Sequence, residues 1–574
     1  MNRVFRLRGL AGAGWLLALT IAAGGCSGKK KGGEGSGGAN ACDQPRKEVR
    51  LAISSLPNTL DWSASNESSA QNYPVILAMM RGLTRLDDAH QPVPDLAETW
   101  EVATDKDRHQ VYTFHLRKDV VWSDGKSPLR AKDFVFGWRR AIQGNEPAEM
   151  ADIVGGDAVI QARERKELAP ADREAAVKKA LDNFGVVAVD DHTLKVTLKS
   201  PRSYFLTRIA YVYTYFPAPS HELEPLEGKG DQAIRAYFNQ PRDGRPLVLG
   251  GYRLETWDQV GQKVVLTKNP HGPLAAEARA VEKLELVQAE LSPLLYDQCK
   301  VDFVFMDDPA ALSGSMSGVS RKPLLSTYFL VFNASKVAPA LRKAIAMALD
   351  RPALMKGLLP EVRPAVTFLP PELPGAIAAD DPLAASFPKL DREAAKKAVA
   401  EAGYKGEPLT LMVRAKGTFL PEVGIAEAVK AQLATIGVNV TIQPSANLTN
   451  DIRAADGTTR VHMYMRRLGA DYAHPQTFFT LFQARGNHYS EYDKLDGGKV
   501  LAELEKLLEE GAAETEPAKM RAAYARAQDL LQSKQTLIVP IFYPDRYFRT
   551  RPWLEGIGVD PFNFLTFRTM RVKQ

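Results

Sequence analysis

Residues 95–142 contain four short segments that together decide the fold: DLAETW at 95–100, VYTFHL at 111–116, SDGK at 123–126 and AKDFVFGWRRAI at 131–142. Thr99 to Val102, which begins at the end of the first segment, and Val111 to Leu116 alternate apolar and polar residues, which is typical of half-buried strands. Ser123 to Lys126 has the composition of a tight turn. Ala131 to Ile142 has apolar residues at helical spacing. The sequence therefore predicts two strands, a turn and an amphipathic helix in this order.

The segments around this stretch extend the pattern. Val49 to Ile53 is typical of a strand, and Tyr73 to Gly82 of a helix that ends at glycine. Val186 to Leu198 predicts a β-hairpin. The second half alternates strands and helices, which indicates an α/β lobe with parallel pairing. Because one hydrophobic core rarely exceeds about 250–300 residues, a chain of 574 residues predicts two or three lobes.

The charge of the chain argues against binding to nucleic acid. The formal net charge is +6, but Arg3, Arg6 and Arg8 supply three of these charges and the linker that follows supplies two. The body is therefore close to neutral. Because nucleic-acid phosphates require clustered Lys and Arg, we expect no nucleic-acid partner.

The N-terminus has the features of an export signal. Arg3, Arg6 and Arg8 precede an apolar run from Leu10 to Ala23, which is too short to span a bilayer as a helix. Ala23-Gly24-Gly25-Cys26 then resembles a bacterial lipobox, so we expect residues 1–25 to be removed and Cys26 to be lipidated. The alternative is an ordinary signal peptide that is cleaved nearby. Residues 26–41 form a Gly- and Lys-rich flexible linker.

Two further cysteines, Cys42 and Cys299, remain in the body. A pair of cysteines in an exported protein either forms a disulfide or stays as two buried thiols.

Catalytic sequence motifs are missing. The sequence has no G-x-S-x-G, H-E-x-x-H or P-loop motif, and its G-x-G-x-x-G match at Gly33 to Gly38 lies in the linker. The nine histidines show no pair at metal-ligand spacing. We therefore expect a protein that is not an enzyme and needs neither a cofactor nor a metal.

Several ordered motifs resemble one family, the peptide- and nickel-binding solute receptors of ABC importers. They extend over residues 46–574 and include the following: Asp95 to Trp100, Tyr112 to Lys118, Trp122 to Gly125, Ala131 to Val135, Asp190 to Thr193, Gly250 to Tyr252, Leu341 to Arg351, Ala402 to Tyr404, Gly437 to Val440, Gly469 to Tyr472, Pro475, Pro552-Trp553, Gly556 and Asp560-Pro561. Within the family, the chain is most similar to oligopeptide- and dipeptide-binding proteins.

This resemblance implies an α/β fold, a two-lobed periplasmic-binding-protein clamshell with an extra domain and with the ligand in the cleft between the lobes. Domain I would combine residues 42–80, 220–326 and 544–574. Domain II would span residues 81–219, and domain III residues 327–543.

The resemblance also implies ligand-binding residues. In oligopeptide-binding relatives, the aspartate of the G-A-D-Y element holds the peptide's α-ammonium group, and Asp471 matches it. Alternatively, Asp471 caps a helix over Pro475 to Leu481. The strand before it, His462 to Gly469, would pair with an extended peptide through Arg466, Arg467 and Leu468.

On the facing side, Asn66 and Glu67 would lie in a cleft loop. Arg453 matches a basic residue that some relatives use for the peptide carboxylate, although a solvated surface arginine is the alternative. The chain also departs from the family: Leu468 replaces a common tryptophan, and Pro147 to Glu149 replaces a segment with a tyrosine. Cys299 resembles a disulfide cysteine of dipeptide-binding relatives, with Cys42 as the substitute partner.

These features predict a monomeric, lipid-anchored protein on the outer side of a bacterial membrane, in the periplasm or at the cell surface. It would capture short peptides and deliver them to the transmembrane subunits of an ABC permease. Two alternatives remain open. The same fold could bind a nickel chelate, a sugar or an opine, for which His462 and His474 are the nearby metal ligands, or the protein could sense peptides without transport.

Overall fold

The computed structural model describes residues 41–63, 70–144, 147–289, 293–306, 318–356, 363–416, 421–453, 459–483 and 492–573. The chain divides into two compact units, Met1–Ala41 and Cys42–Gln574, and the fold concerns the second. The predicted signal segment, Cys26 and nearly all of the linker lie outside the described residues.

The first of two large sheets is mixed and has seven strands. The parallel neighbours β1 and β10 lie in its centre, and β9 and β11 continue the sheet on either side. In sheet order the strands are β12 (Val319–Pro323), β19 (Asp545–Thr550), β11 (Phe303–Phe305), β1 (Glu48–Ile53), β10 (Lys283–Gln288), β9 (Lys263–Lys268) and β8 (Tyr252–Asp258).

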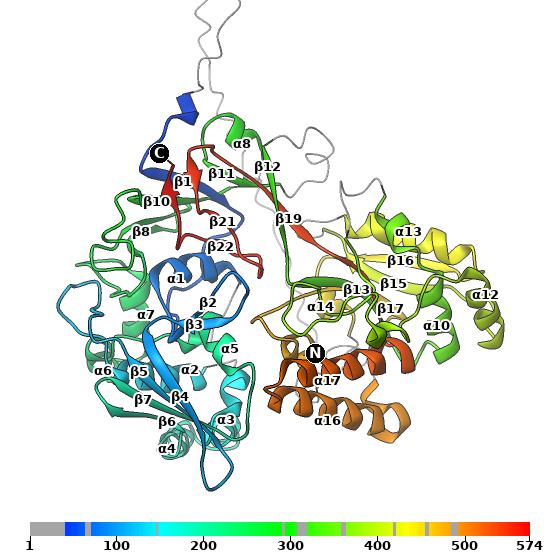
Figure 1. Ribbon diagram of the computed structural model, residues 1–574, viewed down its shortest axis with the longest axis horizontal. Coiled ribbons are helices and arrows are strands. Elements are labelled where there is room, and N and C mark those ends of the chain that lie inside the picture. The colour runs from blue at the N-terminus through cyan, green and yellow to red at the C-terminus, as the bar shows by residue number, and fades with distance from the viewer. Residues whose placement is uncertain are drawn as a thin grey trace, which may run out of the picture. The chain divides into compact units, whose positions relative to one another are not determined.

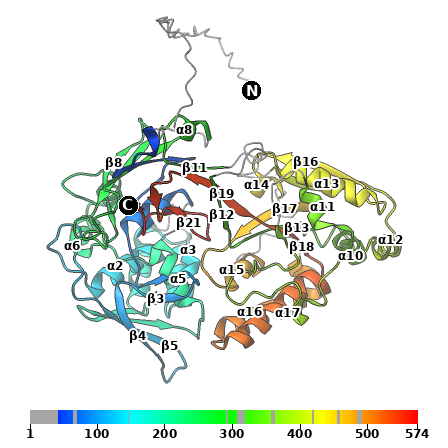
Figure 2. The same ribbon diagram turned by 45° about the horizontal axis from the view of Figure 1, so that its top comes forward.

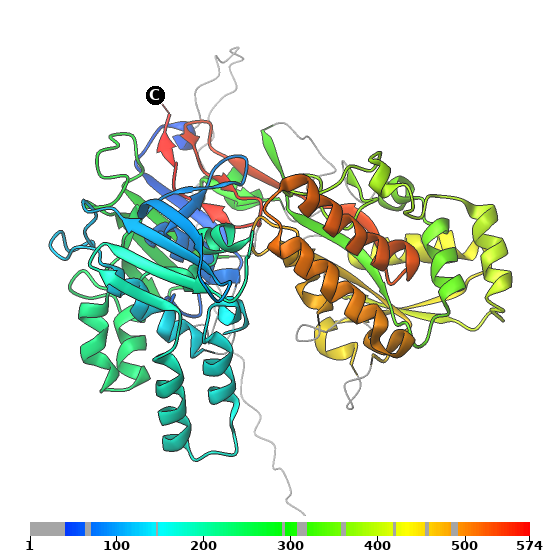
Figure 3. The same ribbon diagram turned by 60° about the horizontal axis from the view of Figure 1, so that its bottom comes forward.

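The second large sheet has six strands with helices on both faces. Its order is β14 (Arg363–Pro364), β18 (Ile538–Tyr543), β13 (Ser326–Phe332), β17 (Met463–Gly469), β15 (Leu409–Arg414) and β16 (Val440–Ser445). One face packs on α10 (Pro339–Ala348), α11 (Arg351–Met355) and α13 (Glu422–Ala434). The other face packs on α16 (Lys499–Ala513) and α17 (Pro517–Asp529), as Figures 2 and 3 show.

A four-stranded antiparallel sheet follows the order β4 (Ala97–Thr104), β5 (Gln110–Leu116), β7 (Thr193–Leu198) and β6 (Val186–Asp190). Three two-stranded pairs join β2 (Thr84–Leu86) to β3 (Pro92–Pro94), β20 (Leu554–Glu555) to β23 (Arg571–Val572) and β21 (Gly558–Val559) to β22 (Leu565–Thr566). The remaining helices are α1 (Tyr73–Met79), α2 (Ala131–Ile142), α3 (Gly156–Glu164), α4 (Pro170–Leu181), α5 (Phe205–Tyr211), α6 (Ser220–Glu227), α7 (Asp231–Asn239), α8 (Pro293–Asp297), α12 (Arg392–Glu401), α14 (Leu448–Asp451) and α15 (Gln476–Phe479).

The chain passes between the two large sheets along two adjacent segments. β12 continues into β13 after Leu324 and Leu325, and β18 continues into β19 after Pro544. The segments stay hydrogen-bonded throughout, because β12 pairs with β19 in one sheet and β13 with β18 in the other. At the crossing, the Leu324 N–H donates to the Pro544 carbonyl at 3.2 Å. Figure 1 shows β12 and β19 side by side there.

The strands and helices expected around residues 95–142 are present as β4, β5 and α2. Parallel pairing in the second half is confirmed for β15 with β16 and with β17. The six-stranded sheet is nevertheless mixed, because β13 pairs antiparallel with both β17 and β18. The division into three domains remains a prediction. Among the described residues, no helix combines the length and the apolar character needed to cross a bilayer.

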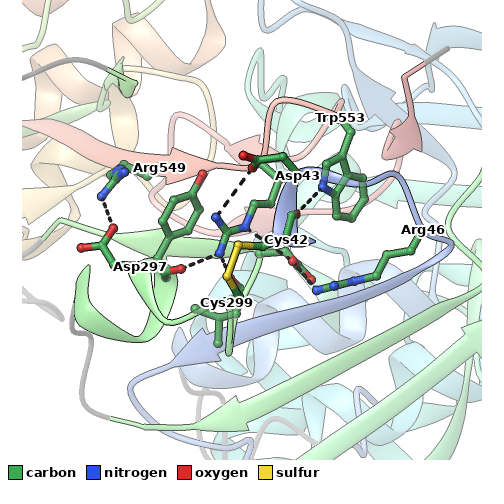
Figure 4. The surroundings of a disulfide bond; sticks show 11 residues. Cys42, Asp43, Arg46, Asp297, Cys299, Arg549 and Trp553 are labelled. Atoms are coloured by element: carbon green, nitrogen blue, oxygen red, sulfur yellow. Dashed lines mark hydrogen bonds and ion pairs between the residues drawn. A yellow bond between two sulfur atoms is a disulfide. The ribbon is translucent and has the colours of Figure 1, made fainter. Parts of the chain in front are cut away.

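Cys42 and Cys299 form a disulfide with Cα atoms 5.4 Å apart (Figure 4). The bond joins the residues just before β1 to the turn between α8 and β11. The Trp553 indole N–H donates to the Cys42 carbonyl at 3.0 Å, and Arg46 pairs with the fully buried Asp302 at 2.5 Å. These contacts hold the start of the folded unit against the seven-stranded sheet.

We expect a variant with both Cys42→Ser and Cys299→Ser to lose about 2–4 kcal/mol of unfolding free energy, because the disulfide closes a long loop in the unfolded chain. Denaturant unfolding under oxidising conditions measures this difference. A reductant should bring the wild-type protein to the variant's value and leave the variant unchanged. Equal unfolding midpoints for the oxidised and reduced wild type would contradict a stabilising role.

Candidate functional site

The first component of the site is the C-terminal half of β17. β13 pairs with this strand along its whole length, from Ser326↔Gly469 to Phe332↔Met463. β15 pairs with it only at Met463 and Tyr464, and the ladder with β15 ends there. Beyond Tyr464, one edge of β17 thus extends past the end of this ladder.

The hydrogen-bond pattern shows which backbone groups point toward this edge. The Asn333 N–H donates to the His462 carbonyl at 2.9 Å, and the Ala470 N–H donates to the Leu325 carbonyl at 2.8 Å. Because antiparallel ladders alternate, every second residue from His462 to Ala470 bonds to β13. The backbone groups of Gly469, one residue out of step with these, therefore point away from β13.

Three predicted ligand residues, Arg466, Arg467 and Leu468, lie in this part of β17 and are half-buried. Arg466 Nη1 donates to Thr449 Oγ1, and Arg467 Nε donates to Ser326 Oγ, both at 3.0 Å. Ser326 Oγ in turn donates to the Leu468 carbonyl at 2.8 Å. Burial lowers the pKa of Arg467. The arginine side chains are thus positioned by hydroxyl groups of neighbouring elements.

Asp471 lies two residues after the end of β17 and is exposed. Its backbone N–H donates to Thr477 Oγ1 at 3.0 Å, and that hydroxyl donates to Asp471 Oδ2 at 3.3 Å. The N-cap of α15 is Pro475. The alternative role of Asp471 as the N-cap of this helix is therefore wrong.

The remaining predicted ligand residues are Arg453, Asn66 and Glu67. Arg453 is half-buried, and its backbone forms a bridge with Thr459 just after α14. Asn66 and Glu67 lie outside the described residues.

A cluster of buried charged and aromatic side chains connects α5 and the segment before it to the segment after β17. We call it the Arg208 cluster. Arg208 Nη2 donates to the Tyr472 hydroxyl at 3.0 Å, and Nη1 pairs with Asp152 at 3.1 Å. The guanidinium lies over the rings of Tyr204 and Tyr472. Because a buried cation is stable only when it is paired and hydrogen-bonded, these contacts depend on one another.

Two more contacts extend the cluster to α16. Arg202 bridges Asp152 at 2.9 Å and Glu509 at 2.8 Å. The Ser203 N–H donates to the Ala512 carbonyl at 2.8 Å. Residues 202–208 thus bind two segments that lie about 300 residues later in the chain.

The same cluster contains a serine next to a histidine, which raises the question of nucleophilic catalysis. His474 Nε2 lies 3.1 Å from Ser203 Oγ. His474 Nδ1 accepts the Gln476 N–H at 3.2 Å, so the hydrogen-bond network assigns the proton to Nε2. The Ser203 hydroxyl donates to the Ala512 carbonyl at 2.9 Å. Because a general base needs a lone pair facing the hydroxyl, this pair cannot activate a serine nucleophile.

Sequence reasoning missed Arg208, and it also missed a hydrogen bond between Tyr211 and Asp560. Asp560 was noted only as part of a family motif, and no local signal connects it to a tyrosine 349 residues earlier. Burial raises the pKa of Asp560 to about 7.

The two candidate metal ligands are held by separate contacts. His462 Nδ1 accepts the Thr410 N–H at 3.1 Å, and His474 is buried in the Arg208 cluster. In the described part of the chain, one group of three potential ligands lies close together, Asp105, Asp107 and His109, at the tip of the β4–β5 hairpin. Asp105 uses its carboxylate there to accept backbone N–H groups of the turn.

A family model for the bacterial extracellular solute-binding proteins, family 5, matches residues 91–490. The chain belongs to this family. The resemblance seen in the sequence motifs is therefore confirmed, and solute binding is the family's function.

Curated relatives match this solute-binding protein along most of its length. The periplasmic oligopeptide-binding protein OppA of Escherichia coli is 28% identical over 522 residues, covering 86% of this chain and 87% of the relative. The dipeptide-binding protein DppE of Bacillus subtilis is 24% identical and covers 98% and 99%. The probable deoxycholate-binding periplasmic protein YgiS of Escherichia coli is 27% identical and covers 93% and 95%.

Solved structures show the same fold. The murein tripeptide binding protein MppA of Escherichia coli has a TM-score of 0.66 at 24% identity, with 92% of this chain and 98% of that chain covered. The Listeria monocytogenes OppA bound to peptide has a TM-score of 0.64 at 21% identity, with 92% and 99% covered. The predicted α/β clamshell fold is thereby confirmed.

We expect the stability of this solute-binding protein to fall with acidification through His474. Burial, followed by the charge of Arg208, lowers its pKa from 6.5 to about 3. The neutral form is favoured in the folded state, so this stabilisation is complete above about pH 6.5 and decreases as the pH falls toward 3. The expected slope is about 1.4 kcal/mol per pH unit for one proton.

Denaturant unfolding of the wild type and His474→Gln over this pH range measures the slope. Glutamine keeps one donor and one acceptor but takes up no proton, so the variant should show a smaller loss. Parallel pH profiles for the two proteins would contradict this role for His474.

Proposed function

We propose that this protein captures short peptides outside the cytoplasm and delivers them to the transmembrane subunits of an ABC permease. The observation that carries the proposal is the position of Asp471, two residues after the end of β17 and close to the half of this strand that lies beyond the ladder with β15. A strand edge and a carboxylate are the two groups needed to bind the backbone and the amino terminus of a peptide.

Backbone pairing suits a ligand of variable sequence. An extended peptide added along Arg466 to Gly469 would use main-chain hydrogen bonds, which all side-chain sequences can form. The outward backbone groups of Gly469 would take part in this pairing. Leu468 and the two arginines would contact the peptide's side chains. Asn66 and Glu67, which the family resemblance assigns to a facing cleft loop, would complete the proposed site.

Charge complementarity would fix the peptide's direction. A charge-assisted hydrogen bond between Asp471 and an α-ammonium group is stronger than a neutral one, more so once the lobes close and exclude water. Arg453 is the proposed partner of the peptide's carboxylate. In the proposed division, the Arg208 cluster already joins domain II, over residues 81–219, to domain III, over residues 327–543. The same contacts would hold the two domains together around a bound peptide.

The relatives support a peptide ligand in different degrees. OppA and DppE are named for oligopeptide and dipeptide binding. YgiS, with nearly the same identity, is named for deoxycholate, which has a carboxylate and no amino group. An anionic ligand of that kind would be repelled by Asp471. The other non-peptide alternatives are a nickel chelate, a sugar or an opine, and none of them is supported by the relatives named above or by a contact in the described site.

The proposed location follows from the N-terminal sequence. Lipidation of Cys26 would anchor the folded unit to the membrane face through the Gly- and Lys-rich residues 26–41, with residues 1–25 removed. The relatives OppA and YgiS are named as periplasmic proteins. We propose that the protein acts as a monomer next to its permease, and a sensor without transport is the alternative.

Thermal unfolding of protein lacking residues 1–26, refolded without ligand, tests the binding proposal. A pool of tripeptides to pentapeptides at about 100-fold over Kd should stabilise by about 2.7 kcal/mol, which raises the Tm by a few degrees. N-acetylation of the pool should remove most of the shift, because it removes the ammonium charge. The Asp471→Asn variant should lose the shift as well.

Asp496→Asn provides a matched control. Asp496 is an exposed carboxylate three residues before α16, paired with Lys499, and its replacement should leave the shift unchanged. Deoxycholate serves as the second ligand. A shift with deoxycholate and none with free peptides would reject the peptide assignment in favour of an apolar anion.

A further inference from the structure

Tyr211, at the C-terminal end of α5, is held in an aromatic group next to the predicted ligand site. Its side chain is 8% exposed. Its ring lies 4.1 Å from that of Phe562 and 5.6 Å from that of Tyr73, measured between ring centroids. The hydroxyl donates to Asp560 Oδ2. The ring and the hydroxyl are thus both fixed in orientation.

The contacts of Asp560 determine the direction of the hydroxyl proton. Asp560 Oδ1 accepts the backbone N–H groups of Phe562 at 3.0 Å and Phe564 at 2.8 Å. Oδ2 is left for Tyr211, so the phenolic proton points at the carboxylate. Because a hydroxyl has one proton and two lone pairs, the oxygen of Tyr211 keeps the capacity to accept a hydrogen bond.

Backbone contacts bring this pair next to Asp471. The Leu325 N–H donates to the Pro561 carbonyl, and the Leu325 carbonyl accepts the Ala470 N–H, both at 2.8 Å. One residue of the crossing segment therefore bonds to the neighbour of Asp560 on one side and to the neighbour of Asp471 on the other.

A second contact joins α5, the helix of Tyr211, to Tyr472, the residue after Asp471. Arg208 bonds to the Tyr472 hydroxyl at 3.0 Å. Because Arg208 and Tyr211 are three residues apart on one helix, they lie on the same side of it. Burial and the carboxylate of Asp560 raise the pKa of Tyr211, and the charge of Asp471 contributes in the same direction. Tyr211 thus lies within electrostatic reach of Asp471.

We propose that Tyr211 is a ligand-contacting residue whose hydroxyl oxygen accepts a hydrogen bond from the same ammonium group that pairs with Asp471. Asp560 is its positioning residue. This inference rests on the proposed function and refines it: the site selects ligands with an unblocked primary ammonium through two groups, one charged and one neutral. The ring of Tyr211 adds an aromatic surface beside the cation.

The competing explanation is purely structural. In that case the bond between Tyr211 and Asp560 joins α5 to the C-terminal segment, and its loss would lower stability without changing ligand preference. The ratio of the affinities for a peptide with and without its terminal amine separates the two explanations. A general loss of stability or of closure would weaken the binding of both ligands equally and leave this ratio unchanged.

Isothermal titration with one tripeptide and with its des-amino analogue, which lacks only the terminal amine, measures this ratio. The wild type should prefer the free amine. Because a hydrogen bond to a charged group contributes about tenfold or more in affinity, Tyr211→Phe should reduce the preference by about tenfold. Asp560→Asn should reduce it as well, because an amide N–H₂ can donate to the Tyr211 oxygen and occupy its lone pair.

Tyr252→Phe is the matched control. It removes a buried tyrosine hydroxyl that donates to the Val281 carbonyl at 3.2 Å in the seven-stranded sheet, and it should keep the wild-type ratio. If the wild type binds the tripeptide and Tyr211→Phe keeps the wild-type ratio, this inference is rejected and the proposed function stands. If the wild type binds neither ligand, both are rejected.

Discussion

The pair of chain segments that joins the two large sheets is the constraint on which the rest of the structure depends. β12 and β19 pair in the seven-stranded sheet, and their direct continuations, β13 and β18, pair in the six-stranded sheet. With two residues between β12 and β13 and one between β18 and β19, neither segment can move independently of the other. Rotation of one sheet against the other is therefore concentrated at Leu324, Leu325 and Pro544, as expected of a hinge in a clamshell protein.

The proposed binding site lies directly at this crossing. Leu325 bonds through its backbone to Pro561 and to Ala470, and Asp471 and Asp560 are the next residues on either side. A change at the hinge would therefore alter the separation of the two carboxylates. The Arg208 cluster acts farther from the crossing, where Arg202 and Arg208 join residues 202–208 to Glu509 and Tyr472. Since both arginines are paired with Asp152, separating these segments would expose charges that are now compensated.

Local sequence patterns predicted much of the fold. Alternation at residues 111–116 and helical spacing at residues 131–142 correspond to β5 and α2, because half-buried elements leave periodic patterns. The antiparallel course of β13 was not predictable, since strand direction depends on partners far away in the sequence. Resemblance to a family, rather than periodicity, singled out Asp471. Neither signal indicated Arg208 or the bond between Tyr211 and Asp560, because a buried arginine or tyrosine has no local pattern that names its partner.

In the proposed complex, a ligand's backbone extends the sheet along the half of β17 beyond Tyr464, where the ladder with β15 ends. Hydrogen exchange at the amide of Gly469, measured with and without a saturating tripeptide, tests it most directly. Peptide should slow exchange at Gly469 strongly, while the Leu468 amide, which faces β13, is already protected and should change little. Tight peptide binding with unchanged exchange at Gly469 would contradict backbone pairing and place the ligand elsewhere.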